Sequence, residues 1–250
     1  MSAHSDNGKG PQGSETLRVL AVSDEVEPQL YNASIKEWLG HVDLIVSCGD
    51  LPANYLDFLV SNLQAPMYHV LGNHCFAPHD PTTGRCSPAA YPGLENLNGK
   101  LAYYDGLVLG GAEGSPLYNG GPHQYNEQQM EVTLLRMVPG MLINKVRTGR
   151  YLDVLVTHAP PAGIYDYTDV AHKGFASLSQ FVDLFKPSLL LHGHTHRYNP
   201  MMPIHTLTGN THIINCYGHV VIELEKDAEA KGWRVNVPEW MRGAHGRSTV

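Results

Sequence analysis

The sequence predicts an α/β fold in which buried strands alternate with amphipathic helices. Two observations support this prediction. Short apolar runs that are rich in β-branched residues recur along the chain, and each ends in polar or glycine-containing residues. Segments with apolar side chains at helical spacing lie between these runs. Such an alternation is typical of parallel strands that are joined by crossover helices.

The individual elements can be placed in chain order. Continuous apolar runs predict strands that are buried on both faces, and they span 17–22, 42–46, 67–71, 152–156 and 187–191. Helical spacing is found in 28–40, 53–63 and 175–185. A longer helical pattern covers 125–150, and Pro139 should break or kink it. Antiparallel strand pairs are expected within 101–111 and within 211–225, the second around Gly218.

The length of 250 residues is enough for one large folded domain. Residues 1–16 are polar and rich in glycine and serine, which predicts a disordered leader. We expect the folded domain over 17–225 and a weakly patterned C-terminal tail over 226–250. Within the domain, 76–99 is rich in proline, glycine and serine and predicts a long ordered loop.

Composition narrows the classes of function and partner. The formal net charge of −7 disfavours nucleic-acid binding, including a nuclease, because such proteins neutralise phosphates with a basic surface. The chain has neither an apolar signal core nor a run long enough to cross a membrane, so we expect a cytoplasmic protein without a membrane partner. The four cysteines are widely spaced and predict reduced, buried thiols. The oligomeric state is left open.

Side chains that ligate metals follow the predicted strands. They are Asp24, Asp50, Asn73, His158, His194 and His196. The carboxyl ends of parallel strands meet at one edge of a sheet, where ligands bind. Carboxylate and amide oxygens and imidazole nitrogens suit divalent metals. On an extended segment, residues two apart point the same way, so the rings of His194 and His196 can converge.

Each of these residues has a structural explanation when it is taken alone. Asp24 and Asp50 could cap the helices that follow them. Asn73 could adopt a left-handed turn after Gly72, and His158 could bond to the backbone. Five strand ends with the same character favour a metal centre over a coincidence.

A pair of bridged metal ions suits one type of chemistry. Two ions about 3.5–4 Å apart can clamp an in-line displacement at phosphorus and activate water. His74, which follows Asn73, could stabilise the transition state or protonate the leaving oxygen. The sequence therefore predicts a phosphoesterase that acts on a phosphodiester or a small phosphomonoester.

At these residues the chain resembles the calcineurin-like metallophosphoesterases. The motifs of that family are D-x-H, G-D, G-N-H-[DE], H and G-H-x-H, in this order and at strand ends. Their counterparts here are Asp24-Glu25-Val26, Gly49-Asp50, Gly72-Asn73-His74-Cys75, His158 and Gly193-His194-Thr195-His196. The resemblance implies a four-layer α/β/β/α sandwich, in which two mixed β-sheets are flanked by helices.

The resemblance also implies a role for each candidate residue. Two divalent ions (Mn, Fe, Zn or Ni) would be bridged by Asp50, and Asp24 with His196 would hold one of them. The other ion would be held by Asn73, His158 and His194. His74 would be the catalytic histidine beside the leaving group.

Two positions depart from the family pattern. Val26 stands where the family has a histidine, so the ion at Asp24 and His196 should be bound more weakly. Cys75 stands where the family has an acidic residue after the catalytic histidine. These departures leave open a second hypothesis, that of a weakly active or non-catalytic binding protein on a degenerate phosphoesterase fold.

The loop after His158 offers two further candidates. Asp169 and His172 could contact the substrate or hold a ligand histidine, and a purely structural loop contact is the alternative.

Overall fold

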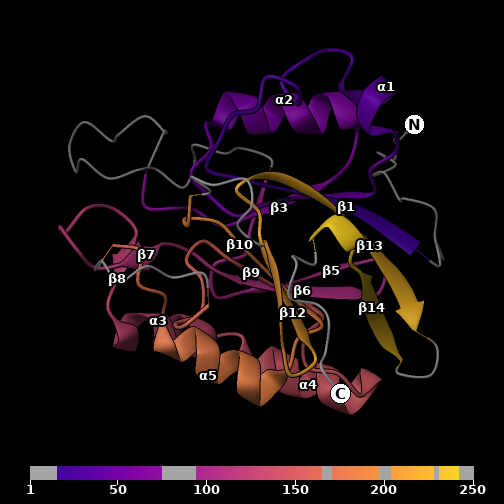
Figure 1. Ribbon diagram of the computed structural model, residues 1–250. Helices are drawn as coiled ribbons and strands as arrows, with labels where there is room; N and C mark the ends of the chain where they lie inside the picture. Colours follow the sequence, from indigo (N-terminus) through magenta and orange to yellow (C-terminus); the bar gives the residue numbers. More distant parts are fainter. Residues whose placement is uncertain (1–15, 75–93, 165–170, 197–203, 228–230, 242–250) are drawn as a thin grey trace, which may run out of the picture.

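The computed structural model describes residues 16–74, 94–164, 171–196, 204–227 and 231–241 (Figure 1). Two six-stranded mixed sheets enclose a shared apolar core, and helices cover the outer face of each sheet. The four-layer α/β/β/α sandwich is therefore confirmed. None of the helices in the described ranges combines the length and apolar character that a membrane span needs.

The first sheet has the strand order β14-β13-β1-β2-β3-β4. Its parallel strands are β1 (Thr16–Ser23), β2 (Leu44–Ser47), β3 (Met67–His69) and β4 (Glu95–Asn96). At the β1 side, β13 (Gly218–Asp227) and β14 (Gly232–Asn236) pair antiparallel. The short α1 (Ile35–Leu39) and α2 (Ala53–Leu63) cover its outer face (Figure 1).

The second sheet has the strand order β11-β12-β10-β9-β6-β5. Its parallel strands are β6 (Leu107–Ala112), β9 (Val154–Thr157), β10 (Leu189–His192) and β12 (Thr211–Asn215). The antiparallel edges are β5 (Leu101–Tyr104) and β11 (His205–Thr208). Its outer face is covered by α3 (Glu127–Leu135), α4 (Val138–Thr148) and α5 (Ala176–Phe185). A small parallel pair, β7 (Ser115–Pro116) and β8 (Gln124–Tyr125), and a 3-10 turn (Glu239–Met241) complete the elements.

Strand β1 illustrates why its sequence is continuously apolar. Val19 and Ala21 point into the core between the sheets, whereas Leu20 and Val22 pack against α1 and α2. Because both faces of the strand are buried, residues on either face contact apolar neighbours, and the sequence does not alternate between apolar and polar residues. Each fully buried Val or Leu side chain contributes roughly 1.5–3 kcal/mol to stability.

The structure corrects the predicted strand pair over 211–225. β12 and β13 lie in different sheets, because the chain crosses between the sheets at Cys216 and Tyr217. β12 pairs instead with β10 and with β11, a strand that the sequence analysis missed. The alternation of apolar residues identified two strands correctly, but it carries no information on which sheet each strand joins.

The folded domain extends past the predicted boundary at residue 225. β13 continues to Asp227, and β14 adds an edge strand in which Trp233 and Val235 are buried. The described residues after 225 are thus largely part of the sandwich rather than a tail. At the other end, Thr16 already belongs to β1; residues 1–15 of the predicted leader and residues 76–93 of the predicted loop lie outside the described ranges.

The helical pattern over 125–150 is broken into two helices, one of the two outcomes expected, but the break lies before the proline. α3 ends at Leu135 and α4 begins at Val138, so the break precedes Pro139. Pro139 lies in the first turn of α4, where its missing N–H would have had no partner in the helix. Proline therefore starts the second helix here instead of interrupting a single one.

Candidate metal centre

All six candidate ligands lie in loops at the carboxyl ends of strands of the two sheets. Asp24 follows β1, Asp50 follows β2, Asn73 follows β3, His158 follows β9, and His194 and His196 follow β10. Several hydrogen bonds join the sheets at this edge. In two of them, the N–H of His194 donates to Oδ2 of Asp24 at 2.9 Å, and Nδ1 of His158 donates to the carbonyl of Cys48 at 2.8 Å. The strand ends that carry the ligand-type side chains thus lie together at this edge, while the assignment of all six as ligands stays a prediction.

The backbone turns sharply at three of these residues. Asp24, Asp50 and His194 have φ values of 65°, 55° and 64°, in the left-handed region. Non-glycine residues in this region cost of order 1 kcal/mol or more and persist where the surrounding structure holds them. Such strain at three strand ends that face one another is typical of a functional site.

Glycines precede three of the candidate ligands because the backbone passes very close to other side chains. A Cβ on Gly72 would collide with the Asp50 carboxylate, and a Cβ on Gly193 would collide with Ser23 and the Asp24 carboxylate. Gly49 has a φ of 105° and leaves no room for a Cβ beside the backbone of Gly72. The recurrent glycine-ligand pairs in the sequence are thus a steric requirement of this centre.

The ligand atoms of Asp24, Asp50 and His158 lie within 4.8 Å of one another. Nε2 of His158 is 3.3 Å from Oδ2 of Asp50 and 3.0 Å from Oδ1 of Asn73. Because Nδ1 donates to the backbone, the lone pair of a neutral His158 ring would face these two oxygens. Electron-rich atoms that converge in this way fit a cation between them.

The charges at this centre influence one another strongly. Burial alone would lower the pKa of His158, but Asp50 and Asp24 favour the imidazolium and raise that pKa to about 9. Burial raises the pKa of Asp24. At Asp50 burial also acts to raise the pKa, but His158 and the hydrogen bond from the backbone of His74 together favour the carboxylate and lower that pKa. The two buried carboxylates therefore require a positive charge close by, which a divalent ion would supply.

Asp24 shows most directly that the donor set fits a metal. Its Oδ2 accepts the hydrogen bond from His194, but its Oδ1 is buried and accepts no hydrogen bond from the described residues. Nε2 of His196 lies 3.8 Å from that oxygen. A buried polar atom without a hydrogen bond costs about 1–3 kcal/mol, which a bound ion would offset.

The two histidines after β10 differ in their surroundings. Nε2 of His194 donates to the carbonyl of Ala171 at 2.7 Å, which leaves Nδ1 available as a ligand atom. Burial and the neighbouring His158 lower the pKa of His194 to about 3, so its ring is neutral. His196 is more open, with 38% of its side chain exposed, and its ring packs 4.9 Å from that of Tyr217.

Of the remaining sequence candidates, some lie beside the centre and others fall outside the described residues. The N–H of His74 donates to Oδ1 of Asp50 at 2.8 Å, and the residue is exposed beside the centre. The ring of His172 stacks 4.9 Å from that of His194. Asp169 and Cys75 lie outside the described residues. His192, which directly precedes Gly193, is completely buried and forms part of the core.

The acidic neighbours of Val26 do not take over the missing histidine ligand. Val26 itself is exposed. Oε2 of Glu27 lies 2.7 Å from Nδ1 of His219, so this carboxylate is engaged in an ion pair on β13. Glu25 is exposed. The described residues around Val26 thus add no nitrogen ligand beside Asp24, and the weaker metal binding expected on this side stays a prediction.

Sequence reasoning did not identify Tyr118 as a contact of the centre. Nδ2 of Asn73 donates to the hydroxyl of Tyr118 at 3.2 Å. Tyr118 lies in the loop between β7 and β8, 45 residues from Asn73 along the chain. Its motif context, a tyrosine before Asn119-Gly120-Gly121, indicates a turn and gives no sign of this contact.

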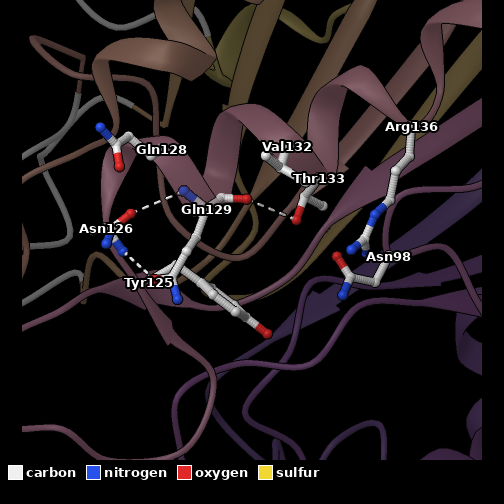
Figure 2. Close-up of a pocket in the computed structure, with 8 residues that line it drawn as sticks. All are labelled: Asn98, Tyr125, Asn126, Gln128, Gln129, Val132, Thr133 and Arg136. Atoms are coloured by element: carbon white, nitrogen blue, oxygen red, sulfur yellow. Dashed lines mark hydrogen bonds between the residues drawn. The ribbon is translucent and has the colours of Figure 1, made fainter.

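A cavity of about 370 Å³ lies along α3, apart from the candidate ligands (Figure 2). Its lining consists of Asn98, Tyr125, Asn126, Gln128, Gln129, Val132, Thr133 and Arg136. Since none of these residues is a candidate ligand, the cavity is not the metal centre.

Comparison with known proteins identifies the family to which the chain belongs. The chain is 26% identical over 229 residues to the UPF0046 protein K07C11.7 of Caenorhabditis elegans, covering 84% of this chain and 72% of that protein. Its fold is similar to those of TT1561 of Thermus thermophilus (TM-score 0.55, 15% identity, 88% and 98% of the two chains) and of GAP50, the anchor in the inner membrane complex of Plasmodium (TM-score 0.50, 16% identity, 88% and 83%). The family profile named calcineurin-like phosphoesterase matches residues 17–198. The chain therefore belongs to the calcineurin-like phosphoesterase family.

Proposed function

We propose that this protein is a metal-dependent phosphoesterase that hydrolyses a small phosphate ester. The observation that supports this most strongly is the cluster of Asp24, Asp50 and His158, whose ligand atoms lie within 4.8 Å of one another. Membership in the phosphoesterase family agrees with this chemistry. Both buried carboxylates and the neutral ring of His194 are of the types that divalent ions prefer.

We propose two metal sites that share Asp50. One is formed with Asn73, His158 and His194, and the other with Asp24 and His196. Divalent ions bound here would activate water and neutralise charge on the phosphoryl oxygens. The second site should be weaker, because Val26 offers no ligand and Glu27 is paired with His219.

The protein's own residues would perform the remaining tasks. The carbonyl of Cys48 fixes the tautomer of His158, and the carbonyl of Ala171 fixes that of His194. The backbone bond from His74 to Asp50 holds His74 at the rim, where its imidazole would protonate the leaving oxygen. His172, stacked on His194, would line the entrance for the substrate.

We favour a phosphodiester over a phosphomonoester as substrate. The described contacts of the centre include histidines but neither lysine nor arginine. A monoester carries about two negative charges at neutral pH, and its additional charge calls for a further cation. A diester carries only one, which suits a centre whose positive charge comes chiefly from the metals.

The proposal can be tested by metal reconstitution. Metal-depleted protein is loaded separately with Mn²⁺, Fe²⁺, Zn²⁺ and Ni²⁺ and assayed on bis(p-nitrophenyl) phosphate and on p-nitrophenyl phosphate. We expect hydrolysis only after loading, with the diester cleaved at least about tenfold faster. Metal uptake without hydrolysis of either ester would instead support the binding-protein hypothesis, and hydrolysis without metal would contradict the proposed centre.

A further inference from the structure

The loop between β7 and β8 is folded around a single side chain, that of Gln124. Its Oε1 accepts hydrogen bonds from the backbone N–H groups of Tyr118, Asn119 and Gly120 at 3.2, 3.1 and 3.1 Å. Its Nε2 donates to Oδ1 of Asn119 at 2.7 Å. Gln124 is only 9% exposed, so water competes little for these bonds. One carboxamide thus sets the conformation of three successive residues.

The base of the same loop is fixed by a buried carboxylate. Oε1 of Glu113 accepts a hydrogen bond from the hydroxyl of Tyr125 at 2.6 Å and lies 3.0 Å from Nδ1 of His123. The N–H of Gly114 donates to the carbonyl of Leu71, just before the segment that leads to Asn73. The loop is therefore anchored both within itself and to the strand end that supplies a candidate ligand.

What the loop presents to the metal centre is the hydroxyl of Tyr118. This hydroxyl accepts a hydrogen bond from Nδ2 of Asn73, while Oδ1 of Asn73 lies 3.0 Å from Nε2 of His158. A carboxamide has a donor end and an acceptor end, and only the oxygen can ligate a metal. With its nitrogen held by Tyr118, the side chain keeps its oxygen toward Nε2 of His158.

We propose that Tyr118 is a positioning residue of the metal centre, which holds the carboxamide oxygen of Asn73 toward the metal, and that Gln124 acts through Tyr118 by fixing the loop. The inference rests on the metal centre of the proposed function. It assigns to a segment outside the family motifs the task of orienting one of their ligands. Partners of ligands typically contribute about 10–100-fold to metal affinity.

The test is calorimetric titration of metal-depleted protein with Mn²⁺ and, separately, with Zn²⁺. Tyr118→Phe removes only the hydroxyl, from a residue that is 37% exposed, and should leave the fold intact. We expect about 10–100-fold weaker binding at one of the two sites. Tyr103→Phe is the matched control, because it removes a tyrosine hydroxyl that donates to Asn144 at 3.0 Å between β5 and α4, and its metal affinity should equal that of the wild type.

Gln124 is tested in the same titration. Gln124→Leu should weaken metal binding to a similar extent, and the double variant Tyr118→Phe/Gln124→Leu should be no weaker than the weaker single variant. Additive losses would overturn the claim that Gln124 acts through Tyr118. Circular dichroism melts of each variant identify any loss that comes from unfolding.

Unchanged metal affinity in Tyr118→Phe would overturn the positioning role, even if the KM for the ester rose. The titration reports on metal alone, so it does not depend on hydrolysis. A wild-type protein that binds metal but cleaves no ester would refute the proposed function and leave the role of Tyr118 to be decided by the variants.

Discussion

The backbone N–H of His194 donates a hydrogen bond of 2.9 Å to Oδ2 of Asp24, a residue 170 positions earlier in the chain. This bond joins the ends of β10 and β1, which belong to different sheets. It satisfies one oxygen of the carboxylate and leaves Oδ1 buried without a hydrogen bond from the described residues. We therefore expect Asp24 to lower the stability of the metal-free protein and to favour the metal-bound form.

Asp24→Asn tests this conflict between stability and binding. The amide oxygen can still accept from His194, while the buried charge is removed. In metal-free protein we expect the free energy of unfolding at pH 7 to rise by about 1–2 kcal/mol. The same variant should lose the metal site formed with His196. Urea denaturation and metal titration measure the two effects, and a variant that is destabilised when metal-free would contradict this account of Asp24.

Val26→His should strengthen the weaker metal site. An imidazole at this position adds a nitrogen ligand on the side of the centre where Glu27 is occupied by His219. We expect at least about tenfold tighter binding, equivalent to about 1.4 kcal/mol. Glu25→His, at an exposed neighbouring position, is the matched control and should not tighten binding. Equal affinities of the two variants would show that residue 26 does not face the metal.

His196→Ala should empty one of the two sites before the other is affected. Nε2 of His196 lies 3.8 Å from Oδ1 of Asp24, and the His196 side chain is partly exposed. The metal content of the purified variant should fall from about two equivalents to about one. His41→Ala, which removes an exposed histidine that pairs with Asp43, is the control and should keep the wild-type content. Retention of both equivalents by His196→Ala would assign the second site to other residues.

Gly72→Ala should abolish metal binding through a steric effect. The new Cβ would meet the Asp50 carboxylate and the His158 ring, so these side chains would have to move apart. We expect a loss of about 1–3 kcal/mol of stability together with the loss of metal. The control is Gly149→Ala, where φ is 81° and no atom lies within 4 Å of the added Cβ. It should cost about 1 kcal/mol through backbone strain and leave metal affinity unchanged.

The sequence predicted much of this centre because ligand positions follow from strand positions. Asp24, Asp50 and His158 each follow an apolar run, and the ends of such runs meet at one edge of the fold. The glycines before Asp50, Asn73 and His194 belong to the same local pattern. The placement of a residue immediately after a buried strand is therefore visible in the sequence.

Other features depend on contacts that no local pattern records. Tyr118 contacts Asn73, which lies 45 residues earlier in the chain, from a loop whose backbone is hydrogen-bonded to the side chain of Gln124. The assignment of β12 and β13 to different sheets, and the edge strand β14, depend on pairings across the whole chain. Pro139 was expected to break or kink the helical pattern, and the pattern is broken, but the position of the break depends on where α3 ends, which the proline does not reveal.

Asp50 is the residue that we propose to join two metal ions in a centre that hydrolyses a phosphate ester. The most direct measurement is metal content and hydrolysis of bis(p-nitrophenyl) phosphate in Asp50→Asn, beside Asp57→Asn, which changes an exposed aspartate on α2. We predict that Asp50→Asn loses metal and more than about 100-fold of the hydrolysis rate, and that Asp57→Asn retains both. Wild-type metal content and a wild-type hydrolysis rate in Asp50→Asn would show that Asp50 does not join the metal ions.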